Sequence, residues 1–406
     1  MQILESIGLA LQAIWSNKLR SLMTVLGNIV AVTSIVAVVS LIQGMNAMVS
    51  NAIVSEASAD AFTIQRFGIM RSDDDRERQQ RNPLVTIAEA DAIRRFSPAI
   101  GSVMAQAQQR ASVSYHQQVL DTVEVQGVTS EYLNFATFNA ERGRMMSAIE
   151  VDRNRPVALL GTDVAARLFG EVNPLDKIIQ IRGTHFRVVG VSAKKGGIFG
   201  NSLDAFVVIP LGVHEKLFGA RQSLALLIKP STPALLPVAM DDATAALRVK
   251  RHLKAREVDN FGIFTSDTLL DLYHQATNGI FAVLVGVVAL SLVVGGIVIM
   301  NIMLMVVTER TREIGLRKAL GARRSDILSQ ILTESTVLSI FGGVVGTIFG
   351  ALIATLIAAF TPIPASVEVW SVGLGIGITA MVGLFFGLYP AMRAARLDPI
   401  EALRRE

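Results

Sequence analysis

The chain alternates between long apolar runs and strongly polar stretches. Four of the runs are long enough to cross a bilayer, which takes about 20 residues in a helix: Leu22–Met45, Gly279–Val307, Ile331–Phe360 and Trp370–Tyr389. A helix satisfies its own backbone hydrogen bonds, as the hydrocarbon interior requires. The pattern therefore predicts an α-helical membrane protein with four transmembrane helices. The first run is too long for a cleavable signal peptide and has no clear small-residue cleavage site.

The charges that border these runs predict the orientation. Lys and Arg gather at Lys18 and Arg20, at Arg310–Arg324 and at Arg393–Arg405. Basic clusters beside short loops remain in the cytoplasm. All three clusters agree on one topology, which favours membrane spans over buried core helices. Both termini are then expected on the cytoplasmic side of the membrane, and the long block between the first two runs is expected outside.

That outer block carries the order strand, helix, strand twice. The first set is "AFTIQRF", "TIAEADAIRRF" and "SVMAQAQQRASVSY", in which Thr86 and Glu89 have the spacing of a capping box. The second set is "SLALLIKP", "PVAMDDATAALRVKRHL" and "FGIFTSD". Together they predict a split βαβ, porter-like part of one large α+β domain. The segment "RSDDDRERQQRNP" is charged and almost free of apolar residues, so a mobile loop is expected there.

An insertion separates the two βαβ halves. It is rich in Gly and in short Val/Ile stretches such as "VEVQGV", "PVALLG" and "FRVVGV", which predict a β-rich subdomain. The predicted order is a cytoplasmic interfacial helix (1–21), span 1 (22–45), the extracytoplasmic domain (46–275) with its β-rich insertion (117–222), span 2 (279–307), a cytoplasmic segment (308–330), span 3 (331–360), an outer loop (361–369), span 4 (370–390) and a cytoplasmic tail (391–406).

The sequence offers no catalytic, cofactor-binding or metal-binding constellation. It has no Cys, which excludes disulfides and thiol catalysis. The motifs G-x-x-x-x-G-K-[ST], H-E-x-x-H and G-x-S-x-G are absent, so the 406 residues carry no ATP-binding P-loop. The spans lack Lys, Arg and His, which disfavours a transporter driven by protons or sodium. Asn28 and Asn301 lie within spans and are expected to hydrogen-bond between helices rather than to bind substrate.

Small residues recur every fourth position in the last two spans. Such rows let helix backbones approach closely, within one subunit or between two. The candidate helix-packing residues are Gly342, Gly346 and Gly350 in span 3, and Gly383 and Gly387 in span 4.

The polar segment between spans 2 and 3 predicts a helical hairpin. Residues 308–320 are expected to extend span 2 as a helix, with Glu313 and Arg317 in a favourable i,i+4 pair. Gly321 suits the position just after a helix end, and Ser325 with Asp326 suits the start of the next helix. A rigid hairpin favours docking to a protein over a basic loop that only sets topology or meets anionic lipid. The candidate docking residues are Gly321, Ala322, Arg323, Arg324, Ser325 and Asp326.

Several of these stretches resemble one family of membrane proteins. The segments "NIMLMVVTERTREIGLRKALGARRSDILSQILTES", "NKLRSLMTVLGNIVAV", "YPAMRAARLDPIEALRRE" and "RPVALLGTDVAARLFGEVNPLDKIIQIRGTHFRVVGV" are similar to the macrolide-exporter (MacB-like) and FtsX-like class of ABC transporter permeases. The resemblance covers nearly the whole chain.

The resemblance implies a permease of the bacterial inner membrane with its large domain in the periplasm, without a fused ATPase domain or a catalytic site of its own. It implies a separate ABC ATPase subunit that binds ATP and Mg²⁺, with the hairpin tip seated on that subunit. A second permease chain, in a homo- or heterodimer, and a periplasmic adaptor with or without an outer-membrane channel are the other expected partners; no nucleic acid is expected. The implied mechanism is mechanotransmission, in which ATP hydrolysis moves the periplasmic domains.

Export of drugs, peptides or other envelope substrates is the leading function. Release of lipoproteins is an alternative within the same four-span plan. A third is a non-transporting transmitter that controls an envelope hydrolase or a sensor kinase, and a fourth is a membrane-anchored binding protein with no ATPase. The sequence leaves the substrate open.

Overall fold

The computed structural model describes residues 18–57, 60–70, 72–135, 138–198, 201–361, 364–365 and 368–404. The chain forms two compact units, of which one is Met1–Met48 with Gln275–Glu406 and the other is Val49–His274. An interfacial helix was predicted at residues 1–21, and residues 1–17 of that segment lie outside the described residues.

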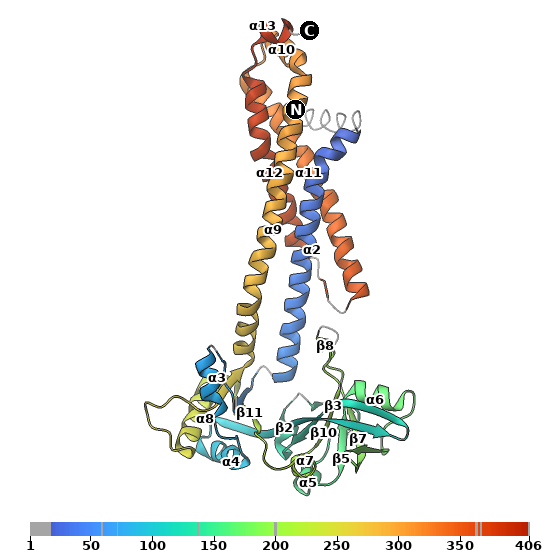
Figure 1. Cartoon of the computed structure of the whole chain (residues 1–406), viewed down its shortest axis with the longest axis vertical. Coiled ribbons are helices and arrows are strands. Elements are labelled where there is room, and N and C mark those ends of the chain that lie inside the picture. The colour runs from blue at the N-terminus through green and yellow to red at the C-terminus, as the bar shows by residue number, and fades with distance from the viewer. Residues whose placement is uncertain are drawn as a thin grey trace. The chain divides into compact units, whose positions relative to one another are not determined.

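The first unit contains the helices expected to cross the membrane. Four described helices are long and apolar enough to do so, which confirms the expected class of an α-helical membrane protein. Helices α11 and α12 pack along each other (Figure 1). The helices of this unit are α2 (Lys18–Ala57), α9 (Ser266–Glu309), α10 (Thr311–Ala319), α11 (Arg324–Phe360), α12 (Val369–Ala395) and α13 (Pro399–Arg404), and α2 and α9 also carry residues of the other unit.

The second unit is the large α+β domain, confirming the expected fold class. Its porter-like part contains both predicted βαβ halves, β1 (Phe62–Gln65), α4 (Ile87–Phe96), β2 (Ile100–Tyr115) and then β11 (Ala225–Pro230), α8 (Leu236–Lys250), β12 (Gly262–Thr265). The strand order is β12-β1-β11-β2, with antiparallel neighbours throughout. Helices α4 and α8 lie against one another and bury a core that includes Ile64, Ile93, Val103 and Leu247.

The inserted part is a small closed barrel rather than an open sheet. Its strands pair in the order β2-β3-β10-β5-β7, and β6 closes the ring by pairing with both β7 and β2. The barrel core includes Val125, Leu160, Phe186 and Ile209. The elements of this part are β3 (Gln118–Val128), η1 (Ser130–Asn134), β4 (Ala140–Gly143), α5 (Ala148–Asp152), β5 (Val157–Leu160), α6 (Thr162–Phe169), β6 (Ile178–Ile181), β7 (Thr184–Ser192), β8 (Gly197–Ile198), β9 (Asn201–Ser202), β10 (Phe206–Pro210) and α7 (Leu211–Phe218); a short η3 (Pro233–Leu235) precedes α8.

Strand β2 belongs to both parts. Near its start it pairs with β11 of the porter-like part, and from Gln106 onward with β3 of the barrel. At Val113 and Ser114 it also pairs with β6. The barrel is therefore joined to the porter-like part by backbone hydrogen bonds as well as by the two chain crossings.

The prediction of a loop at residues 71–83 is wrong, because this segment contains a helix, α3 (Asp73–Gln80). Ser72 caps it by accepting the Asp75 N–H, and three Asp residues occupy its first turn, where negative charge is favourable. Gln79 Oε1 accepts the Gly68 N–H at 2.8 Å, which ties the helix to the chain beside β1. Polar pairing stabilises this helix without any buried side chain.

The predicted orientation can be tested by labelling introduced cysteines. Asp204 would be a poor position, because it is 3% exposed and both of its carboxylate oxygens accept backbone N–H groups. Val249→Cys, at 67% exposure, is expected to react with a membrane-impermeant thiol reagent from outside. The exposed Arg312→Cys is expected to react only after the membrane is permeabilised. The opposite pattern would invert the topology.

Candidate coupling site

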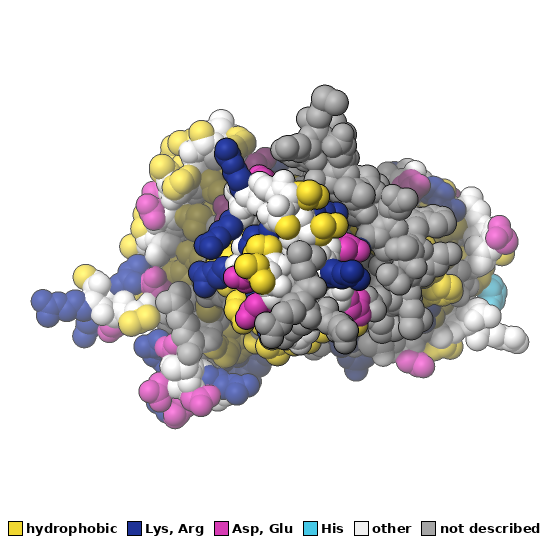
Figure 2. All heavy atoms as spheres, turned by 90° about the horizontal axis from the view of Figure 1, so that it is seen from above, with side chains coloured by type: hydrophobic (Ala, Val, Ile, Leu, Met, Phe, Trp, Pro, Cys, Tyr) yellow, Lys and Arg dark blue, Asp and Glu magenta, His cyan; other side chains and the backbone are white. Residues whose placement is uncertain are grey.

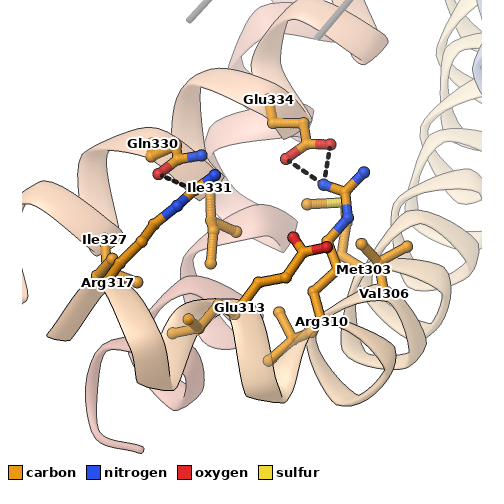
Figure 3. A pocket seen from close by; sticks show the side chains of 11 residues that line it. Met303, Val306, Arg310, Glu313, Arg317, Ile327, Gln330, Ile331 and Glu334 are labelled. Atoms are coloured by element: carbon orange, nitrogen blue, oxygen red, sulfur yellow. Dashed lines mark hydrogen bonds and ion pairs between the residues drawn. The ribbon is translucent and has the colours of Figure 1, made fainter. Parts of the chain in front are cut away.

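The polar segment after α9 forms a separate short helix, and this corrects the expected continuous helix at 308–320. The chain turns at Arg310, whose φ and ψ of −92° and 16° end α9 and begin α10. Thr308 and Thr311 donate their hydroxyls to carbonyls within the turn, which competes with regular helix geometry. Arg310 Nη1 lies 3.2 Å from Glu334 Oε1 of α11, and Figure 3 shows the two side chains pointing toward each other.

The turn from α10 to α11 is closely defined. Gly321 has a φ of +100°, a conformation that favours glycine. The Gly321 N–H donates to Lys318 O and the Ala322 N–H to Arg317 O, both at 3.1 Å. These two bonds form the Schellman motif that ends many helices. The expectation that Gly321 ends the first helix is therefore confirmed.

The start of α11 differs from the prediction by two residues. The helix begins at Arg324 with Arg323 as its N-cap, so the expectation that Ser325 caps it is wrong. The Asp326 carboxylate accepts the Arg323 N–H at 2.9 Å, because it lies at the third helical position and reaches back to the cap. Asp326 thus lies near the positive end of the helix, as expected. The side-chain hydrogen bond at the start of α11 therefore comes from the Asp326 carboxylate, whereas the Ser325 hydroxyl was expected to cap the helix.

A buried apolar cluster holds α10 against the ends of three long helices. Ile314 on α10 packs with Met303 and Val307 of α9. The other buried members are Ile299, Ile327, Ile331, Ala391 and Ala394, with Ala322 at the edge of the cluster. Ala322 is therefore half-buried in the protein's own core, whereas the other five predicted docking residues are exposed.

Polar contacts fix α10 as well. Arg317 Nη1 donates to Gln330 Oε1 of α11 at 2.8 Å (Figure 3), so its hydrogen bond reaches across the hairpin rather than along the helix to Glu313 as expected. A small cavity of about 40 Å³ lies between α9, α10 and α11, and the Glu313 and Arg310 side chains line it. Within the described residues, no group of three or more His, Asp or Glu could hold a metal ion.

Two contacts here were not predicted from the sequence. Lys318 Nζ donates to Ala395 O at 2.9 Å and to Leu397 O at 2.5 Å, satisfying carbonyls at the end of α12. Gly315 lies against Ala402 of α13, so closely that a Cβ at Gly315 would lie 2.6 Å from the Ala402 Cβ. The only sequence signals were a Lys among many basic residues and a Gly within a helix.

Large apolar side chains are exposed on the hairpin and on α13. Leu316 and Leu320 of the hairpin are 53% and 81% exposed, and Ile400 of α13 is 76% exposed. Arg323 and Arg324, which follow Leu320 closely in sequence, are exposed as well. Figure 2 looks onto the end of the unit that carries α10 and α13 and shows Lys and Arg side chains around apolar ones. Large exposed aliphatic side chains at a helix end, rimmed by charge, are typical of a protein-docking surface.

The predicted glycine rows lie between helices of the same chain. Gly346 faces Ile29 and Val32 of α2, and the Thr33 hydroxyl donates to Gly346 O at 3.0 Å. Gly350 faces Val36 of α2. Gly342 is buried in α11, and Gly383 and Gly387 of α12 lie against Ser339 and Ser335 of α11.

The fold and this site define an integral membrane protein with four membrane helices, a large α+β domain between the first two, and a clamped hairpin between the second and third. Residues 21–246 match the family model of the MacB-like periplasmic core domain, and residues 285–399 match that of the FtsX-like permease C-terminal region. The chain belongs to the MacB-like, FtsX-like family of ABC transporter permeases, which are inner-membrane proteins.

Individual relatives align over the whole chain. It is 33% identical over 412 residues to the macrolide export ATP-binding/permease protein MacB of Bdellovibrio bacteriovorus, and spans 62% of that protein's length. It is 32% identical over 414 residues to the uncharacterized ABC transporter permease YknZ of Bacillus subtilis, with all of both chains aligned. The crystal structure of the periplasmic region of MacB from Actinobacillus actinomycetemcomitans matches 54% of this chain and 95% of that one, with a TM-score of 0.45 and 20% identity.

Proposed function

We propose that this chain is the permease subunit of an ABC transporter that works by mechanotransmission. The hairpin tip Gly321–Asp326, together with Leu316 and Leu320, docks on an ABC ATPase, and ATP hydrolysis there moves the extracytoplasmic domain. The observation that carries the proposal is the combination of a firmly clamped α10 with large apolar side chains left exposed on its outer side.

The contacts of α10 suit the transfer of force. An ion pair joins the turn at Arg310 to α11, Lys318 joins α10 to the end of α12, and Gly315 packs against α13. A displacement of α10 would therefore act on the ends of several membrane helices together. No chemistry is required of the hairpin, and ATP and Mg²⁺ would bind on the ATPase.

Efflux is the transport function that we propose. Some relatives are named as macrolide export proteins, and that name supports export of drugs, peptides or other envelope substrates. The proposed partners are the ATPase, a second permease chain and a periplasmic adaptor, with or without an outer-membrane channel.

Photo-crosslinking in producing cells tests the docking and identifies the partner in the same experiment. A photoreactive residue at Leu320 is expected to capture an ABC ATPase, identified by mass spectrometry. The matched control is the same residue at Val249, which is also strongly exposed but lies on α8 of the extracytoplasmic domain. Capture of the ATPase at neither position, or equally at both, would contradict the proposal.

Leu320→Glu is expected to lower permease-dependent ATP hydrolysis by the captured ATPase at least about tenfold, since docking would bury an unpaired carboxylate. Ala322→Glu is a less specific test, because Ala322 packs at the edge of the buried cluster and the change would disturb folding too. Val249→Glu serves as the control for adding a charge. If the Leu320→Glu variant forms the complex and supports ATP turnover as the unmodified protein does, the hairpin does not dock on the ATPase, and its basic residues serve only to set the topology.

A further inference from the structure

A groove of about 610 Å³ lies at the C-terminal end of α12, where the apolar sequence of this helix gives way to charged residues. Two basic side chains, Arg393 and Arg396, line it together with two carboxylates, Asp398 and Glu401. The charges of the lining therefore balance. A ligand that fits this groove carries a negative and a positive group.

The two guanidinium groups of the groove are available to a ligand. Arg393 and Arg396 are three positions apart, so they share one face of α12, and both are exposed. Within the described residues, neither side chain makes an ion pair or a hydrogen bond. The carbonyl oxygens of Ala395 and Leu397 already accept hydrogen bonds from Lys318. Two unpaired guanidinium groups on one face suit a phosphate, which Arg binds through charge-assisted hydrogen bonds.

An exposed row of apolar and aromatic side chains leads along α12 into the groove. Met381, Phe385 and Tyr389 follow one another at intervals of four residues and are 71%, 74% and 54% exposed. Side chains four positions apart lie one above another on a helix, and Arg393 continues this row. Tyr389 also lines the groove, and Tyr is typical of the membrane–water boundary. The row joins a surface suited to acyl chains to a charged groove, which favours a phospholipid over a free phosphate.

The carboxylates of the groove distinguish between phospholipid headgroups. Helix α13, which carries Glu401, lies beyond the end of α12 (Figure 1). A phosphate held by the two Arg side chains therefore directs the rest of its headgroup toward carboxylates. These carboxylates repel a second acidic group. A quaternary ammonium has no N–H to donate to them, whereas a primary ammonium has three.

We propose that this groove binds a phospholipid whose headgroup carries a primary ammonium. Its phosphate lies between Arg393 and Arg396, its ammonium faces Asp398 and Glu401, and its acyl chains follow the row that contains Phe385. The bound lipid would hold α12 and α13 together at the point where α10 packs on them. Residues of this chain alone form the groove, so the proposal depends neither on an ATPase nor on a second permease chain.

Native mass spectrometry of the purified full-length protein in detergent tests the lipid binding. Phosphatidylethanolamine, phosphatidylglycerol and phosphatidylcholine with identical acyl chains are compared, and phosphatidylethanolamine is expected to bind most tightly. Replacing both Arg393→Gln and Arg396→Gln is expected to weaken its binding at least about tenfold, because two charge-assisted contacts are lost. The control, Arg323→Gln with Arg324→Gln, removes two exposed Arg residues outside the groove and is expected to leave binding unchanged. Equal weakening in both double variants, or equally tight binding of phosphatidylglycerol, overturns the proposal.

Glu401→Gln tests the contact with the ammonium. The change removes the negative charge and keeps the shape of the side chain. It is expected to lower the preference for phosphatidylethanolamine over phosphatidylcholine about threefold or more, since a charge-assisted hydrogen bond becomes a neutral one. Binding of phosphatidylcholine is expected to stay the same and serves as the internal control. An unchanged preference would show that the headgroup does not contact the carboxylate. Displacement of the lipid by an equal concentration of soluble phosphoethanolamine would overturn the assignment to a lipid.

Discussion

Gly346→Leu is expected to prevent the membrane helices from packing. A Cβ on Gly346 would lie 2.8 Å from the Ile29 carbonyl oxygen and 2.9 Å from the Val32 Cβ, both on α2. Because a carbonyl oxygen of a helix cannot turn away, α2 and α11 must separate, and the Thr33 hydrogen bond to Gly346 O is lost with them. Overpacking typically costs about 1–3 kcal/mol, and a full Leu side chain against backbone lies at the upper end or beyond.

The measurement is the thermal unfolding midpoint and the yield of monodisperse protein in detergent. Gly377→Leu is the matched control, because it also lies in a membrane helix but has open space where a Cβ would be. The control is expected to behave like the unmodified protein. Equal midpoints for the two variants would show that α2 and α11 tolerate separation at this point.

Arg251→Met is expected to destabilise the extracytoplasmic domain by about 3–5 kcal/mol, because it leaves a buried carboxylate without its partner. The Arg251 and Glu89 side chains are 5% and 8% exposed, and Nε lies 2.7 Å from Oε1. Arg251 also donates to the backbone and side-chain oxygens of Asn260, at 2.8 Å each. The pair therefore joins α4 to the segment that leads into β12.

Hydrogen exchange on the full-length protein measures this effect. Amides of β1, β11 and α4 are expected to lose protection in the Arg251 variant. Arg81→Met is the control, since its ion pair with Glu77 is 80% and 74% exposed and such pairs contribute about 0–1 kcal/mol. Protection that is equally retained in both variants would mean that the buried pair contributes little to stability.

Local patterns made much of the extracytoplasmic fold predictable. Thr86 and Glu89 form the capping box that their spacing predicts, and both βαβ halves appear in the expected order. The closed barrel could not be predicted, because β6 pairs with β2 across more than 60 residues and nothing in either strand encodes that partner. Helix α3 was missed because polar pairing at its cap, rather than apolar periodicity, stabilises it.

In the membrane unit, too, local features could be predicted from the sequence and contacts between distant segments could not. Apolar length predicts the spans, and Gly321 predicts the end of α10 because only its backbone conformation matters there. The partners of Lys318 and Gly315 depend on where α12 and α13 end in space, which no local pattern records. Asn301 was expected to bond between helices, and because its side chain is exposed on α9 that expectation stays a prediction.

The shared strand β2 has a mechanical consequence. Along its 16 residues it is bonded to β11 near one end and to β3 along the rest, and the two pairings overlap at Gln106. A pull directed along this strand would load many backbone hydrogen bonds in shear at once, whereas opening a sheet from its edge breaks them one by one. The barrel and the porter-like part would therefore move as one rigid body under such a pull. Any hinge between elements that move relative to one another must then lie outside β2.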